Sequence, residues 1–163
     1  MILLDADVLS AFAKVSKLSL LYKLFSQHFL YISPAVLAKI KVSLDKGHNF
    51  AREIFELFEK GQLKVLVLNK KEKQEKEELP VYLGEGEKEN IVICKMRGGV
   101  LLSNEKKVEQ FCKTTKITCL RIPAILRAFW EVGVVNIDEV RNVVEEMKEK
   151  DRMGFTERAL KEM

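Results

Sequence analysis

The sequence predicts a three-layer α/β/α fold with a central parallel sheet of about five strands. Short apolar runs alternate with segments of helical periodicity, which is the pattern of parallel strands joined by crossover helices. The runs are mostly apolar, as expected for strands of a buried sheet. The five predicted strands are Met1 to Leu4, Phe29 to Ile32, Leu63 to Leu68, Val100 to Leu102 and Lys116 to Leu120.

Helices are predicted between these strands from apolar stripes and from residues that favour helix ends. Ser33 before Pro34 predicts a helix that begins at Pro34, because serine caps helices and proline suits the first helical position. Three further helices are predicted as ranges: Glu85 to Met96, closed by Gly98 and Gly99; Glu105 to Thr114, capped by Ser103 or Asn104; and Ile122 to Trp130. Four more are predicted from apolar stripes: Val8, Leu9 and Phe12; Leu18, Leu21, Leu24 and Phe25; Phe50, Ile54, Leu57 and Phe58; and Val140, Val143, Val144 and Met147.

We expect a single domain over residues 1–163. Residues 70–78 carry four Lys and four Glu and no apolar residue, so we interpret 70–79 as a charged surface excursion in a loop. The two helical patterns after Leu120 lead into a polar tail. We therefore treat residues 138–163 as a helical extension at the carboxyl end.

Composition and charge exclude several classes of protein. The net charge of +4 on 163 residues excludes a dedicated polybasic binder. Contact with nucleic acid is still possible, because phosphate binding needs a local basic patch and not a large total charge. No apolar run approaches the length of about 18 residues that a membrane helix needs, and the first residues lack the pattern of a signal peptide. Three cysteines without CxxC spacing argue against zinc and favour a reducing, cytoplasmic setting. The Lys/Glu bias points to a hot habitat.

Aspartate residues occur at the end of the first predicted strand. Asp5 and Asp7 follow the apolar run Ile2 to Leu4, although the chain has only five Asp. In open α/β sheets, ligands bind beyond the carboxyl ends of the strands. One of these two residues also suits the N-cap of the helix that follows.

A second acidic group lies in the first turn of the helix that begins at Glu85. The positive end of the helix dipole favours acids there whatever the function. Glu87 shares a helix face with Ile91 and Cys94, whereas Glu89 lies about 200° around the helix. We therefore expect one of the pair to face a shared site, and we favour Glu87.

A third group, Ser103, Asn104 and Glu105, follows the predicted strand Val100 to Leu102. A helix cap could account for these residues. However, three strand-to-helix junctions then carry acids at the same edge, and clustered carboxylates are costly without a cation. Oxygen ligands of this kind suit Mg²⁺ or Mn²⁺.

The arrangement resembles a known family. LLDADVLSAF is similar to the first motif of PIN domains, the metal-dependent ribonuclease fold of VapC-type toxins. GEGEKENIVIC resembles the helix with their third acid, and LLSNEKKV resembles their fourth motif. IPAILRA followed by VGVV resembles the closing helix and turn of one PIN-like branch from archaea and bacteria. The resemblance covers residues 1 to about 137.

The resemblance implies roles for individual residues. Asp5 matches the first acid, Glu87 or Glu89 the third, and Glu105 with Asn104 the fourth. Active members favour Asp where Asn104 stands. Further residues implied to support the site are Asp7 and Ser103.

The second acid of the family is missing, because Lys39 stands where Glu is usual. We expect Lys39 either to insert its ammonium group among the acids or to extend outward along the helix surface. The first arrangement would weaken metal binding.

The activity implied by the resemblance is Mg²⁺- or Mn²⁺-dependent hydrolysis of phosphodiester bonds in single-stranded RNA. The resemblance also implies a small antitoxin protein as partner and a homodimer. We expect Asp5, Glu87 and Glu105 to be the catalytic residues. We expect the metal ligands to be Asp5, Glu87, Glu89 and Glu105.

Three alternative functions remain at this point. A haloacid-dehalogenase-type phosphatase would share the Asp-x-Asp but needs a following Gly-Thr and later motifs that the sequence lacks. A receiver domain would need an Asp after the third strand, where Asn69 and Lys70 stand. A catalytically degenerate PIN-like domain that binds RNA or protein is the main competitor, because Lys39 is the departure it predicts.

Overall fold

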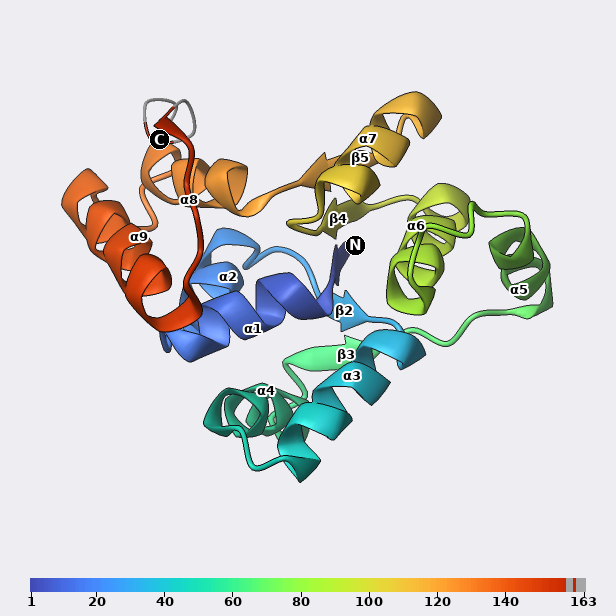
Figure 1. Ribbon diagram of the computed structural model, residues 1–163, viewed down its shortest axis with the longest axis horizontal. Coiled ribbons are helices and arrows are strands. Elements are labelled where there is room, and N and C mark those ends of the chain that lie inside the picture. Colours follow the sequence, from blue (N-terminus) through green and yellow to red (C-terminus); the bar gives the residue numbers. More distant parts are fainter. Residues whose placement is uncertain (158–159, 161–163) are drawn as a thin grey trace.

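A computed structural model describes residues 1–157 and 160 of the chain. Strands and helices alternate through most of its length (Figure 1). In chain order they are β1 (Ile2–Leu4), α1 (Ala6–Lys14), α2 (Leu18–Leu24), β2 (Leu30–Ile32), α3 (Pro34–Asp45), α4 (Asn49–Glu59), β3 (Leu63–Val65), α5 (Lys70–Glu77), α6 (Glu85–Arg97), β4 (Val100–Leu102), α7 (Lys106–Thr115), β5 (Thr118–Leu120), α8 (Ile122–Glu131) and α9 (Ile137–Asp151).

The five strands form one sheet in the order β3-β2-β1-β4-β5, and every neighbouring pair is parallel. The first strand of the chain is thus the central one, with Ile2 of β1 opposite Leu30 of β2 and Val100 of β4. Each of the five predicted apolar runs contains one of these strands. The prediction of a three-layer α/β/α fold with a parallel sheet is confirmed.

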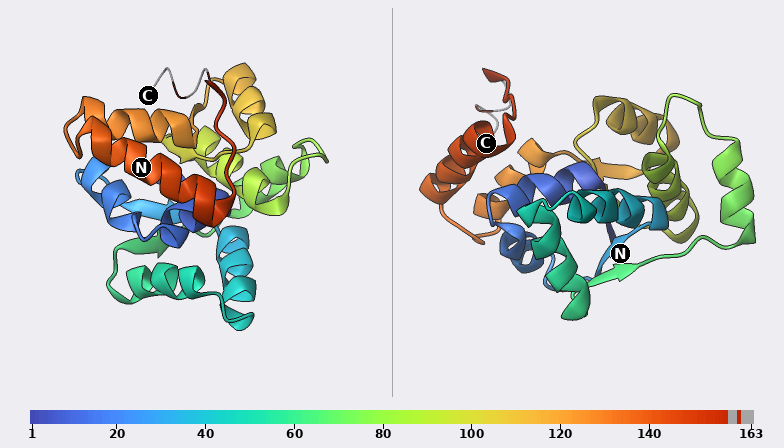
Figure 2. Two further views of the ribbon diagram at one scale, coloured as in Figure 1. Left: turned by 60° about the vertical axis from the view of Figure 1, so that its left-hand side comes forward. Right: turned by 60° about the horizontal axis from the view of Figure 1, so that its bottom comes forward.

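The two faces of the sheet are covered by different helices. Ile2 and Leu4 of β1 pack into a core formed with residues of α1, α2, α3, α4, α8 and α9. Leu3, which points to the other face, packs with residues of α6 and α7. Figure 1 shows α1, α8 and α9 to the left of the sheet and α5 and α6 to the right. Figure 2 shows α5 and α9 at opposite ends of the molecule.

The charged segment 70–79 was wrongly expected to be a loop, because residues 70–77 form α5. Asn69 and Glu72 form a capping box at its start, with hydrogen bonds of 3.0 and 2.7 Å. The side chain of Glu72 is completely buried, and it accepts hydrogen bonds from Nε and Nη2 of Arg97 at 2.5 and 2.6 Å. The guanidinium group holds the pKa of Glu72 below its usual value. An ion pair therefore docks α5 on α6 in place of an apolar stripe.

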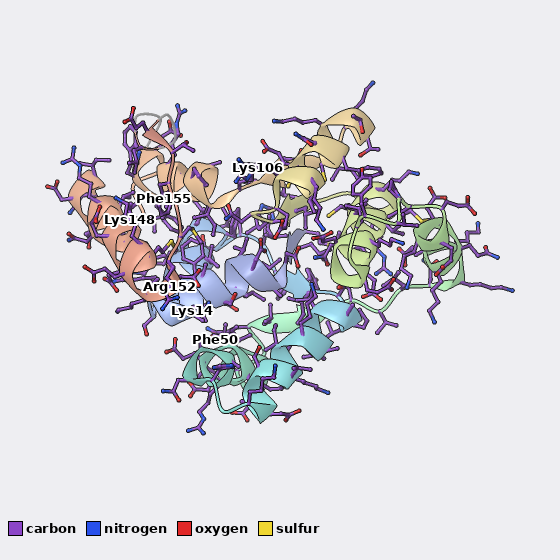
Figure 3. The ribbon with its side chains drawn as sticks, viewed as in Figure 1. Lys14, Phe50, Lys106, Lys148, Arg152 and Phe155 are labelled. Atoms are coloured by element: carbon purple, nitrogen blue, oxygen red, sulfur yellow. The ribbon has the colours of Figure 1, made fainter. Side chains whose placement is uncertain are left out.

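Near its carboxyl end the chain packs against its first helix. Lys14 at the end of α1 pairs with Asp151 at the end of α9, and its Nζ lies 5.3 Å from the ring centroid of Phe50 in α4 (Figure 3). The predicted helical extension 138–163 contains most of α9. Residues 158–159 and 161–163 lie outside the described part. Among the described helices, none has the length and apolar character needed to cross a membrane.

Gly99 allows β4 to pair closely with β1. Its φ of +139° is one that other residues rarely adopt, and an added Cβ would lie 2.8 Å from the carbonyl oxygen of Met1. The next residue, Val100, donates its backbone N–H to that same oxygen at 3.0 Å. This glycine therefore permits the strand pairing that places the end of β4 beside the end of β1.

Candidate functional site

Asp5 lies at the carboxyl end of the central strand and caps the helix that follows. Its backbone is extended, and its Oδ1 accepts a hydrogen bond of 2.8 Å from the N–H of Ala6. Its Oδ2 accepts a hydrogen bond of 3.2 Å from Oγ of Ser103, the residue after β4. Asp5 is 4% exposed and Ser103 is fully buried. The capping role and the site role thus belong to the same carboxylate.

The environment of Asp5 favours its neutral form. Burial raises its pKa most strongly, and the charge of Glu87 raises it further. The hydrogen bonds from Ala6 and Ser103 and the charge of Lys39 lower it, but the net direction is upward. A carboxylate that is buried beside another acid is one that a bound cation would stabilise.

Asp7 lies in the first turn of α1 and faces the end of β4. Its Oδ1 accepts from the N–H of Val8 at 2.7 Å, and its Oδ2 accepts from the N–H of Asn104 at 2.9 Å. Burial, followed by the charge of Asp5, raises the pKa of Asp7 to about 7. The charge of Glu105 acts in the same direction. Asp7 therefore changes protonation near neutral pH.

Glu87 reaches the same edge from α6. It is 6% exposed, and its Oε2 accepts a hydrogen bond of 2.8 Å from the N–H of Gly84. The preceding Gly86 lets α6 approach closely, because an added Cβ would lie 3.1 Å from Cγ2 of Val36 and 3.9 Å from Oδ1 of Asp5. Glu87 and Asp5 are thus neighbours from different elements, which explains the repulsion between their charges.

Glu89 has a different neighbour. Its Oε2 accepts a hydrogen bond of 2.8 Å from the N–H of Ala35, in the first turn of α3. It therefore joins α6 to the start of α3 and satisfies a helix N-terminal donor. Of the two glutamates, Glu87 is the one that the structure brings beside Asp5.

Asn104 and Glu105 lie at the edge of the site, between the end of β4 and the start of α7. Glu105 is exposed and occupies the N-cap position of α7, where Ser103 or Asn104 was wrongly expected. Its N–H donates to Oγ of Ser103 at 3.4 Å, and its own side chain makes no capping hydrogen bond. Asn104 turns its side-chain oxygen toward the N–H of Ile122 at 3.4 Å, at the start of α8. The fourth motif thus contributes Ser103 to the buried part of the site and Glu105 to its rim.

Lys39 is exposed on α3, yet its charge lowers the pKa of Asp5. It lines a pocket of about 230 Å³ together with Asp7, Ser10 and Phe50. Neither expected arrangement describes it fully, because the residue is exposed and its charge still lowers the pKa of Asp5.

Lys107 is the residue that sequence reasoning missed. Its Nζ lies 3.0 Å from Oε2 of Glu87 and donates to the carbonyl oxygen of Tyr82 at 3.1 Å. The sequence feature that could have indicated Lys107 is its position in the first turn of α7, the helix that begins at this edge of the sheet. In a chain rich in lysine, that position alone does not distinguish it from Lys106.

The site can be tested for the divalent ion that the resemblance implies. Within residues 1–157 and 160, no three Asp, Glu, His or Cys side chains gather as a metal centre. However, Mg²⁺ is commonly held by one or two carboxylates, with water and substrate phosphates completing its shell. Asp5 and Glu87 supply two such carboxylates, and Oδ2 of Asp5 is bonded to a neutral hydroxyl. The donor set fits a single ion of this kind.

Comparison with known proteins agrees with this fold. The sequence profile of the DUF3368 family, described as a PIN domain, matches residues 1–163. Searches of curated proteins and of solved structures found no match. The family match spans every element that places an acid at the sheet edge, and it identifies the chain as a member of the PIN-domain family.

Proposed function

We propose that this chain is a metal-dependent endoribonuclease that hydrolyses phosphodiester bonds of single-stranded RNA with Mg²⁺ or Mn²⁺. The observation that supports the proposal most is the buried Asp5 at the carboxyl edge of a PIN-domain sheet, where its charge interacts with those of Glu87 and Asp7. The family has a nuclease-type fold.

Different residues of the site suit different roles in this reaction. Asp5 and Glu87 would hold the ion, with Ser103 orienting Asp5 through its hydrogen bond. A bound divalent ion lowers the pKa of water and stabilises the charge that develops on the phosphate. Asp7 suits the role of general base, because a pKa of about 7 lets its carboxylate accept a proton near neutral pH. Asp7 also lines the pocket that contains Lys39, so its carboxyl group is accessible from that side.

A second candidate is a catalytically degenerate domain that binds RNA or protein. The ion pair between Lys107 and Glu87, together with Lys39 at the rim, favours it, because both cations oppose a divalent ion. This candidate predicts RNA binding that is independent of metal.

The decisive experiment is cleavage of a fluorescein-labelled single-stranded RNA by the purified chain in Mn²⁺ and in EDTA. Cleavage should depend on Mn²⁺ and should be abolished by Asp5→Asn. The matched control is Asp45→Asn, at the exposed end of α3. Equal cleavage by wild type and Asp5→Asn would refute the assigned role. RNA binding in EDTA without any cleavage in Mn²⁺ would favour the binding module.

Family resemblance also supports proposals on partners and setting. We propose a small antitoxin protein as partner, a homodimer, and a cytoplasmic location in a thermophilic archaeon. Light scattering of the purified chain tests the dimer, and a melting temperature above about 90 °C would support the thermophilic source.

A further inference from the structure

Lys107 holds a position between two helices that carry the site. It extends from the first turn of α7 and pairs with Glu87 in the first turn of α6. The same ammonium group donates to the carbonyl oxygen of Tyr82, in the turn that precedes α6. These two contacts direct a positive charge to an acid that is almost completely buried.

Several carboxylates act on this ammonium group. The hydrogen bond with Glu87 raises the pKa of Lys107 most, and the charges of Glu105 and Asp5 act in the same direction. Lys107 therefore contacts one of the two proposed metal ligands, Glu87, and its charge also interacts with those of Asp5 and Glu105. A cation bound at Glu87 would compete with this ammonium group for the same carboxylate oxygen.

The surroundings permit this side chain to leave. The Lys107 side chain is 40% exposed, whereas that of Glu87 is 7% exposed. A lysine on a flexible stem can move its charge into water without displacing the helix that carries it. When it leaves, Glu87 keeps its hydrogen bond from the N–H of Gly84, so the start of α6 stays in place.

We propose that Lys107 is an internal counter-ion, which neutralises Glu87 in the metal-free protein and which a divalent ion must displace in order to bind. The inference rests on the proposed metal site at Asp5 and Glu87. Because the Lys107 ammonium group competes with the ion for Glu87, the site is occupied only at a higher free concentration of the metal ion.

The test is calorimetric titration of the metal-free protein with Mn²⁺ alone. Lys107→Gln keeps a polar side chain of similar length and removes the charge, so its Mn²⁺ affinity should rise about ten-fold, since a unit charge no longer repels the ion. Lys107→Arg should bind Mn²⁺ as the wild type does, because it restores the charge. The matched control is Lys106→Gln, which removes the same charge from the neighbouring position at the start of α7 (Figure 3).

A second readout separates displacement from a general loss of positive charge. In EDTA, Lys107→Gln should lower the melting temperature, because Glu87 is left buried without its ion pair. Mn²⁺ should then raise the melting temperature more in Lys107→Gln than in wild type or Lys106→Gln. A Mn²⁺ affinity of Lys107→Gln that equals or falls below that of the wild type overturns the inference. An equal gain in Lys106→Gln overturns it as well.

The inference and the nuclease proposal can fail separately. Tighter Mn²⁺ binding by Lys107→Gln, with no RNA cleavage by any variant, would uphold the counter-ion and refute the nuclease. Mn²⁺-dependent cleavage by wild type, with unchanged affinity in Lys107→Gln, would do the reverse. Tight binding that persists in the double variant Lys107→Gln/Asp5→Asn would place the ion elsewhere and overturn the inference.

Discussion

The hydroxyl of Ser103 donates a hydrogen bond of 3.2 Å to Oδ2 of Asp5 and so joins the ends of β1 and β4 through their side chains. Both residues are buried, and the hydroxyl lowers the pKa of Asp5 against the opposing effect of burial. The bond therefore favours the charged form of the carboxylate, which is the form that a cation needs.

Replacing Ser103 by Ala should destabilise the protein more at pH 8 than at pH 4. The variant leaves a buried carboxylate oxygen without its donor, at a cost of roughly 1–2 kcal/mol when Asp5 is charged. At low pH Asp5 is protonated and needs the donor less. Urea denaturation at the two pH values measures the difference, with Ser43→Ala as the control because its Oγ bonds to the backbone of Lys39 in its own helix. Equal losses at both pH values would contradict the role given to Ser103.

Asp7 should make the metal-free protein less stable as pH rises from about 4 to about 7. Its pKa is about 7 in the folded state against an ordinary value of 3.8, so the folded state binds more protons over this range. The stability contributed by the neutral form is therefore present at low pH and lost through pH 7. Asp7→Asn should remove this loss and raise stability at pH 8 by roughly 1–2 kcal/mol, after the weakening of one hydrogen bond.

Thermal melts of wild type and Asp7→Asn in EDTA from pH 4 to pH 8 check this prediction. The two curves should diverge with rising pH, while Asp45→Asn should follow the wild type. Parallel curves would show that Asp7 is ionised throughout the range.

Replacing Lys39 by Glu should strengthen Mn²⁺ binding and raise any cleavage activity. The substitution changes the charge at this position from +1 to −1. Lys39 lowers the pKa of Asp5 and lines a pocket with Asp7, so the new carboxylate lies near both residues. We expect a gain in affinity of about ten-fold. Calorimetry checks the affinity, with Lys41→Glu as a control for the same charge reversal at an exposed position of α3. An equal gain in both variants would mean that only net charge matters.

Replacing Arg97 by Met should destabilise the protein by roughly 3 kcal/mol, because it leaves Glu72 buried and unpaired. The double variant Arg97→Met/Glu72→Leu should recover most of this loss, since no buried charge remains. Chemical denaturation of the single and double variants measures both effects. A double variant as unstable as Arg97→Met would show that packing, and not charge, holds α5 in place.

Much of the fold could be predicted because it depends on local patterns. Each strand lies within one of the predicted, mostly apolar runs, and Ser33 with Pro34 marks the start of α3 as expected. The helix α5 could not be predicted this way, because the residue that docks it, Glu72, finds its partner Arg97 twenty-five positions along the chain. A charged segment is predicted to be exposed to solvent unless the partner of its charges is known. Here the partner is brought in by a tertiary contact, which the local sequence does not show.

The candidate site shows the same division between local and tertiary information. The position of Asp5 after the first strand follows from the sequence, as does the separation of Glu87 from Glu89 on the helix. The contact between Lys107 and Glu87 depends on how α6 and α7 pack, and no spacing along the chain encodes it. The same is true of Glu105, whose backbone takes the cap position and leaves its side chain at the rim.

The placement of the first strand at the centre of the sheet affects when the proposed site can assemble. As the chain leaves the ribosome, β1 can pair with β2, and β2 with β3, well before β4 has been synthesised. Until then β1 has an open edge on the side that β4 will occupy, and Ser103 is not available to Asp5. Contacts between distant parts of a chain form late. A nascent chain thus cannot assemble the proposed cutting site until about two thirds of its own message has been translated.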